Sequence, residues 1–241
     1  MRRILGLVMG VILVMGCEIP DAGYREDIEI VIVKAPGQPR HPYQDEYERM
    51  LYPTVRISSP AGTGTGVIIT TEDTENTEHI YILTAAHVVE DESTVDIELY
   101  DSTNITATIV ITDTIRDLAI LKPQITQINT DKIYTARLAP ESYTAYLFTP
   151  IYTVGCSLGL LPRPSNGIIT AINTDSWEVS SPILPGNSGG PVFDGRTYEV
   201  IGIAVWVKTY QGQLITTMAG LVPVNQIYEF LQPQIHTDGH R

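Results

Sequence analysis

The segment GNSGGP at residues 186–191 is the stretch from which the fold and the chemistry of this chain can be argued. It places Ser188 between glycines, which permit a tight turn and let backbone amides come close to a substrate oxygen. A serine hydroxyl is a poor nucleophile by itself, so this interpretation requires a general base and an orienting carboxylate elsewhere. The candidates are His87, in the segment LTAAHVV, and Asp117, in the segment RDLAILK.

These three segments, in the order His, Asp, Ser, resemble the trypsin-like (chymotrypsin-fold) serine proteases, and most closely their bacterial HtrA/DegP-type branch. The resemblance covers residues 52–230 and includes three more segments in the order of the family: GTGTGVII at 62–69, VGCSLG at 154–159 and AGLVPV at 219–224. It implies an all-β fold of two six-stranded antiparallel β-barrels, with the active site between them and a short C-terminal helix.

Each motif also has a plainer interpretation. Taken singly, His87 reads as an ordinary core or surface histidine, Asp117 as a turn residue before a buried strand, and Ser188 as a polar residue in a glycine-rich turn. The segment around Ser188 also fits the nucleophile elbow of α/β-hydrolases, but that fold requires the histidine to follow the serine. The histidines after Ser188 are His236 and His240, in a polar tail, which disfavours the hydrolase alternative.

The pattern of apolar residues indicates an all-β barrel or sandwich, because short β-branched runs recur without helical periodicity between them. The expected strands cover 66–70, 79–84, 95–100, 105–112 and 118–121 in a first set, and 151–155, 167–172, 177–180, 191–193, 200–207 and 214–223 in a second. A brief helix is expected at 45–51 and a C-terminal helix at 224–231. The protease domain is therefore placed at 51–232, before a polar tail at 233–241. The ten residues after Leu231 cannot supply the PDZ domain that HtrA-like proteases commonly carry there.

The N-terminus predicts export. Two arginines precede an apolar run at residues 4–15, which is too short for a spanning helix of about 20 residues but typical of a secretory signal. Residues 14–17, Val-Met-Gly-Cys, resemble the lipobox of bacterial lipoproteins, so residues 1–16 are expected to be removed and Cys17 to carry lipid. Residues 17–50 read as a tether and lead-in to a protein of the bacterial cell envelope, facing the periplasm or the cell exterior. The alternative is an ordinary signal peptide with a chance cysteine.

Charge and cysteine content limit the possible partners. The formal net charge of −13 disfavours nucleic acid and anionic headgroups as direct partners. The acidic residues are dispersed, and the densest group, at 72–78, reads as a solvated hairpin loop without the ligand spacing of a calcium site. We therefore expect no metal or cofactor. Cys156 reads as a buried, small apolar residue and not as a catalytic thiol.

The resemblance implies that Ser188 attacks a peptide carbonyl, His87 transfers the proton and Asp117 orients the imidazole. Residues Gly186, Asn187 and Ser188 would form the oxyanion hole, with the backbone amides of Gly186 and Ser188 as its donors. Because position 187 is not the aspartate of zymogen-activated relatives, activity should not depend on a newly cut N-terminus; loop ordering by substrate or self-association could replace it.

By the same analogy, the specificity pocket is bounded by five uncharged residues: Ile183, Leu184, Ala204, Val205 and Trp206. Two function classes follow. The first is an exported, lipid-anchored serine endopeptidase acting on proteins or peptides after small or medium aliphatic residues. The second is a catalytically idle, protease-like binding module at a membrane surface.

Overall fold

Runs of β-branched residues separated by turn-forming residues build most of this protein. The computed structural model describes residues 41–60, 62–72, 78–90, 92–124 and 133–235. The predicted signal peptide, Cys17, most of the tether, residues 73–77 of the acidic hairpin loop and residues 236–241 lie outside the described residues.

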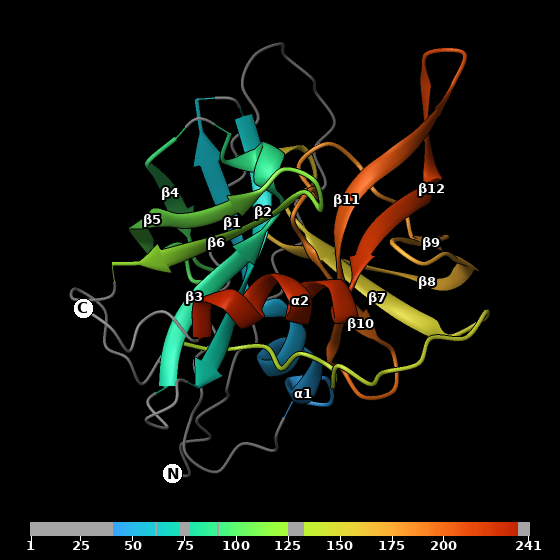
Figure 1. The fold of residues 1–241 in the computed structure, drawn as a ribbon, viewed down its shortest axis with the longest axis horizontal. Helices are drawn as coiled ribbons and strands as arrows, with labels where there is room; N and C mark the ends of the chain where they lie inside the picture. Colours follow the sequence, from blue (N-terminus) through green and yellow to red (C-terminus); the bar gives the residue numbers. More distant parts are fainter. Residues whose placement is uncertain (1–40, 61, 73–77, 91, 125–132, 236–241) are drawn as a thin grey trace, which may run out of the picture. The chain divides into compact units, whose positions relative to one another are not determined.

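The first half of the described chain forms a closed antiparallel barrel (Figure 1). Its strands, in the order β1-β2-β3-β6-β5-β4, are β1 (Thr54–Ser59), β2 (Gly62–Glu72), β3 (Glu78–Thr84), β6 (Leu118–Pro123), β5 (Asn104–Asp113) and β4 (Thr94–Glu98). The barrel closes where β1 pairs with β4, with Ile57 opposite Ile97. Closure leaves these strands without a free sheet edge.

The second half repeats this arrangement. Its barrel, in the order β10-β11-β12-β9-β8-β7, contains β10 (Pro191–Asp194), β11 (Val200–Tyr210), β12 (Gln213–Pro223), β9 (Trp177–Val179), β8 (Arg163–Ile172) and β7 (Pro150–Gly155). The β11–β12 hairpin is longer than its sequence pattern predicted and extends away from the barrels in Figure 1. The expected all-β fold of two six-stranded barrels is thus confirmed.

Three apolar clusters fill the structure. One lies inside the first barrel around Ile57 and Leu121, and another inside the second barrel around Ile169 and Ile201. The third joins the two halves, because it contains Leu83 and Phe193 together. Burial of apolar area is the main stabilising term in folding, so this shared cluster sets how the two barrels lie against each other.

Helical segments cover the junction. The predicted N-terminal helix is observed as α1 (Gln44–Glu46) followed by the π-helical turn η1 (Tyr47–Leu51). The predicted C-terminal helix is α2 (Val224–Ile235), which buries residues spaced three and four apart, among them Ile227 and Leu231, in the apolar core. Short 3-10 turns, η2 (Ala86–Val88) and η5 (Ser157–Gly159), were not predicted, and both lie at the site described below.

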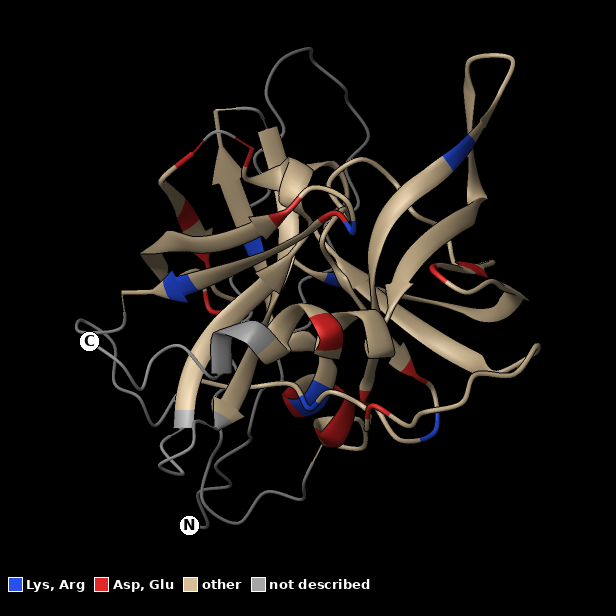
Figure 2. Ribbon diagram, in the orientation of Figure 1, with Lys and Arg blue, Asp and Glu red and all other residues tan. Residues whose placement is uncertain are grey.

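The charged residues follow the expectation of dispersal. Figure 2 shows acidic residues distributed over the loops, strands and helices of both halves, with basic residues scattered among them. No helix in the described part of the chain is long and apolar enough to cross a membrane.

Candidate active site

His87 lies at the point where strand β3 ends in the η2 turn. The residues before it, Thr84 to Ala86, are buried, and the Val88 amide donates to Ala85 O at 3.2 Å. Thr84 Oγ1 also donates to Thr65 O at 2.6 Å, which anchors the end of β3 to β2. The strand end is therefore fixed, while 44% of the His87 side chain stays exposed.

Asp117 holds the His87 ring from the β5–β6 turn. Its backbone is left-handed, with φ 58°, a conformation that aspartate tolerates better than most residues. Oδ1 accepts from the His87 backbone amide at 3.0 Å, and Oδ2 contacts His87 Nδ1 at 2.7 Å. These two contacts fix the ring orientation and favour the tautomer with the proton on Nδ1, which leaves Nε2 as an acceptor.

The same contact changes the acidity of the histidine. The hydrogen bond to Asp117 raises the pKa of His87 above its usual 6.5, partial burial opposes this shift, and the negative charges of Asp117 and Glu90 add to it. A stabilised imidazolium is what a general base requires after it accepts a proton.

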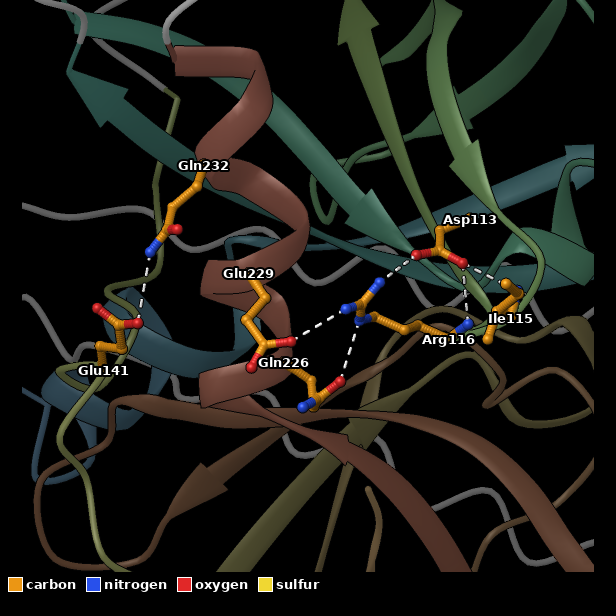
Figure 3. Close-up of polar contacts among 7 residues, drawn as sticks. All are labelled: Asp113, Ile115, Arg116, Glu141, Gln226, Glu229 and Gln232. Carbon is orange, nitrogen blue, oxygen red and sulfur yellow. Dashed lines mark hydrogen bonds and ion pairs between the residues drawn. The ribbon is translucent and has the colours of Figure 1, made fainter. Parts of the chain in front are cut away.

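A second network holds the turn that carries Asp117 (Figure 3). The guanidinium of Arg116 donates to Asp113 Oδ2 at 2.8 Å, to Gln226 Oε1 at 3.0 Å and to Glu229 Oε2 at 3.0 Å. Gln226 and Glu229 lie on α2, more than 100 residues away in sequence. The turn of the first barrel is thus tied to the C-terminal helix.

Ser188 belongs to a loop that packs on both barrels. Its carbonyl accepts from the Thr65 amide of β2 at 2.8 Å, and the next amide, of Gly189, donates to Ala204 O of β11 at 2.8 Å. Gly189 has φ 81°, and a Cβ built there would lie 2.3 Å from Thr65 O and 2.8 Å from Ala85 N. Only glycine fits this approach, which brings the loop against the strand end that leads to His87.

The hydrogen bond that the structure gives the His87 ring is the one to Asp117. Contact between a serine nucleophile and its base is often long in a free enzyme and tightens when substrate binds. The structure places the Ser188 loop, which leads into the second barrel, against the end of β3 that precedes His87, and Asp117 of the first barrel contacts His87.

The three backbone amides at 186–188, expected to lie at the oxyanion hole, do not have the same surroundings. The amide of Asn187 donates to Leu184 O at 3.0 Å, so this amide is already occupied. Within the described residues, the amides of Gly186 and Ser188 donate to no protein acceptor. Gly186 has φ 96°, and a Cβ there would lie 2.3 Å from Cys156 O, so the loop requires glycine at this position.

The five residues expected to bound the specificity pocket do not share one surface. Ile183 and Ala204 are buried together in the second barrel, each 3% exposed. Leu184, which follows Ile183 in sequence, is half-buried. Val205 instead packs against the first-barrel and junction clusters. A bulge follows Ala204, and the Trp206 ring covers Gly220, where an added Cβ would lie 1.9 Å from Trp206 Cε2.

Comparison with known proteins agrees with this geometry. The family model described as a trypsin-like peptidase domain matches residues 64–203, more than half of the 241-residue chain. The chain belongs to the trypsin-like peptidase family.

Curated relatives of this trypsin-like peptidase are HtrA- and DegP-type proteins, as the sequence motifs predicted. It is 31% identical over 160 residues to "Serine protease Do-like HtrA" of Bacillus subtilis, covering 59% of this chain and 33% of the relative. It is 32% identical over 186 residues to "Probable periplasmic serine endoprotease DegP-like" of Halomonas elongata, covering 73% of this chain and 35% of the relative. The chain spans about a third of the length of these curated relatives.

Solved structures share the fold. A serine endoprotease from Yersinia pestis superposes with a TM-score of 0.64 at 21% identity, covering 84% of this chain and 70% of that one. The HtrA-type protease AlgW, solved with a tripeptide, gives a TM-score of 0.67 at 22% identity, covering 81% of this chain and 64% of that one.

Three residues of this trypsin-like peptidase that contact the site were not singled out from sequence: Thr65, Arg116 and Ser157. Arg116 precedes Asp117 directly, which is the one signal that could have drawn attention to it. Thr65 and Ser157 lie in two quoted motifs, but nothing in those motifs indicates what their hydroxyls contact. Cys156, expected to be buried, is fully buried, and burial raises the pKa of its thiol to about 12.

Proposed function

We propose that this chain is a serine endopeptidase that cleaves proteins or peptides with Ser188, His87 and Asp117. The observation that carries the proposal is the two-point contact of Asp117 with His87, at 3.0 Å to the backbone amide and 2.7 Å to Nδ1. That contact leaves His87 Nε2 able to accept a proton at the site where the Ser188 loop meets the end of β3.

The proposed reaction follows from these positions. Ser188 Oγ forms a bond to the peptide carbonyl carbon as its proton passes to His87 Nε2, and the carbonyl oxygen becomes an oxyanion. The amides of Gly186 and Ser188 donate to that oxyanion, and one such donor is typically worth about 3 kcal/mol. The C–N bond then breaks as His87 returns the proton to the leaving amine, and water releases the acyl group by the reverse proton path.

A fluorophosphonate probe tests the proposal, because it phosphonylates an activated serine. We expect the native protein to be labelled at Ser188, and Ser188→Ala and His87→Ala to lose both labelling and peptide cleavage. Heat-denatured protein serves as the control for non-specific labelling. A folded wild-type protein that stays unlabelled, beside a control protease that labels, would support the idle binding module instead.

We further propose cleavage after small or medium aliphatic residues such as Ala, Val, Ile or Leu. The support is that the five residues expected to bound the pocket are uncharged and that the Trp206 ring lies over Gly220. A charged P1 side chain buried there without a partner would cost several kcal/mol, whereas each matched methylene gains about 0.8 kcal/mol. Profiling with a peptide library at neutral pH checks this, and dominant cleavage after Lys, Arg or Glu would refute it.

Export and lipid anchoring at Cys17 complete the proposed function. The support is the short apolar run before Gly16-Cys17 in the sequence, together with relatives whose names describe them as periplasmic. Two or three acyl chains hold a protein stably at a membrane, whereas one chain is marginal. Mass spectrometry of the mature N-terminus decides, with Cys17→Ser as the control that should leave the protein unmodified. A mature chain that begins at another residue would remove the anchor.

Self-association also stays a prediction. Sedimentation of the purified protease domain over a range of concentrations measures it directly.

A further inference from the structure

Residues 156–158, which follow β7, hold residues 185–187 of the loop that carries Ser188. We call this loop the nucleophile loop. The Leu158 amide donates to Pro185 O at 2.8 Å. The Cys156 amide donates to Thr65 Oγ1 at 2.8 Å, and Thr65 Oγ1 in turn donates to Gly186 O at 2.6 Å.

The third contact involves side chains. Ser157 Oγ donates to Asn187 Oδ1 at 2.6 Å. Asn187 is 6% exposed and lies against Gly155, where an added Cβ would be 2.8 Å from Asn187 Oδ1. Glycine at 155 therefore makes room for the carboxamide that Ser157 contacts. We call Thr65, Cys156, Ser157 and Leu158 the clamp.

The clamp determines where the Gly186 amide points. In a trans peptide the C=O and N–H groups are coplanar and point in opposite directions. Because Pro185 O is directed at the Leu158 amide, the N–H of Gly186 is directed away from η5, and it donates to no acceptor among the described residues. Rotation of this peptide would break the contact with Leu158 and carry the donor out of the site.

The backbone of the clamp is left-handed at Leu158. Leu158 adopts φ 57° and ψ 27°, a left-handed conformation that is uncommon for residues other than glycine and costs free energy. Its side chain is 71% exposed, so packing of that side chain does not explain the conformation. The turn that contains this residue is held to the loop by the hydrogen bond from the Leu158 amide to Pro185 O.

We propose that the clamp is the activating element of this chain, with Ser157 and Thr65 as positioning residues that hold the oxyanion-binding amides in place. Where zymogen-activated relatives use an aspartate paired with a cut N-terminus, this chain uses Asn187 and the Ser157 hydroxyl. The oxyanion hole is thereby formed in the free, uncleaved chain. The inference rests on the proposed peptidase function and adds the residues that keep it active.

Four variants of the purified protein test the clamp: Ser157→Ala, Thr65→Val, the conservative Thr65→Ser and the control Tyr143→Phe. The control removes a comparable hydrogen bond, from Tyr143 OH to Asp194 Oδ2 at 2.5 Å, at the far end of β10 from Ser188. The measurements are kcat and KM on a peptide substrate, the affinity of a peptide aldehyde that forms an oxyanion on Ser188, and the melting temperature.

We expect Ser157→Ala and Thr65→Val to lower kcat about 10- to 100-fold with KM nearly unchanged. Complete loss of one oxyanion donor lowers kcat about 100- to 1,000-fold, and a donor that is only displaced should cost less. Aldehyde affinity should fall by the same factor as kcat. Thr65→Ser, which keeps the hydroxyl, should retain most of the activity. Tyr143→Phe should lower the melting temperature without changing kcat.

If both Ser157→Ala and Thr65→Val kept the kcat and the aldehyde affinity of the wild type, the inference would be overturned. A loss in Thr65→Val that Thr65→Ser shares would also contradict it, since the hydroxyl would then not be the cause. If the wild type neither labels nor cleaves, the proposed function fails separately. Crystal structures of the wild type and of Thr65→Val then test the clamp without an activity measurement. We expect the 185–186 peptide to be rotated in the variant and not in the wild type.

Discussion

Arg116 Nη2 donates to Glu229 Oε2 at 3.0 Å, which connects the turn carrying Asp117 to the C-terminal helix α2 (Figure 3). Asp113 accepts from the backbone amides of Ile115 and Arg116 at 2.9 and 3.0 Å and so shapes the same turn. Asp117, which contacts the proposed catalytic base His87, therefore depends on a helix that follows the second barrel.

Arg116→Met should lower kcat/KM about three- to tenfold, because the side chain keeps an unbranched apolar stem but loses the guanidinium contacts that hold Asp117 in place. The free energy of unfolding should fall by no more than about 1 kcal/mol, since the ion pair to Glu229 is largely exposed. Kinetics and urea unfolding measure the two effects. Glu141→Ala, which removes a contact to Gln232 elsewhere on α2, serves as the control and should leave kcat/KM unchanged. A drop in activity that only parallels lost stability would argue against this role.

The pH dependence of kcat/KM should have an acidic limb with a midpoint above 6.5, because the pKa of His87 is raised and the neutral ring is the base. Asp117→Asn removes the hydrogen bond and the charge that raise this pKa, so the midpoint should move to lower pH while kcat falls.

The raised pKa of His87 makes folding stability and activity change in opposite directions with pH. A raised folded-state pKa contributes stability that is full below the unfolded-state value near 6.5 and is lost as pH rises through the folded-state value. The His87 contact therefore favours the folded state most where the enzyme is least active. NMR titration of His87 beside the rate profile checks both statements, and a His87 midpoint below 6.5 would contradict them.

Gly189→Ala should destabilise the protein by about 3 kcal/mol or more, because a left-handed backbone and a clash with buried backbone atoms act together. Gly212→Ala is the matched control. Gly212 has φ 78°, but a Cβ there meets nothing within 4 Å, so only the conformational cost of about 1 kcal/mol applies. Chemical denaturation measures the free energy of unfolding of both variants. Equal losses of stability would show that the loop around Ser188 can shift to accommodate the added methyl group.

Trp206→Ala should widen the accepted P1 residues toward Phe and Met, because removal of the ring uncovers Gly220. We expect kcat/KM for a P1 Phe substrate to rise about tenfold relative to P1 Ala, in the range that hydrophobic pockets discriminate. Val205→Ala is the control, since Val205 packs toward the first barrel and its loss should leave the P1 preference unaltered. An unchanged preference in Trp206→Ala would show that the ring lies outside the pocket.

Much of the fold could be predicted from the chain because its signals are local. Alternating β-branched runs indicate strands wherever they occur, and they predicted most of the twelve strands observed. Strand β1 and the first half of β8 were not among the expected runs. The order of the motifs predicted that His87, Asp117 and Ser188 act together, of which the contact between His87 and Asp117 is observed. Cys156 was expected to be buried because the sequence predicts a strand at the edge of the core there, and it is buried.

The tertiary structure alone decided what holds these residues in place. Thr65 and Gly186 are 121 residues apart, and Arg116 and Glu229 are 113 apart, so no local pattern indicates either contact. Barrel closure and the junction between the barrels bring them together, and an irregularity after Ala204 shifts the register of β11 against β12. Composition and motif order specify the catalytic groups, whereas strand register and barrel packing specify the hydrogen bonds that hold those groups in position, because such bonds join segments that are distant in sequence.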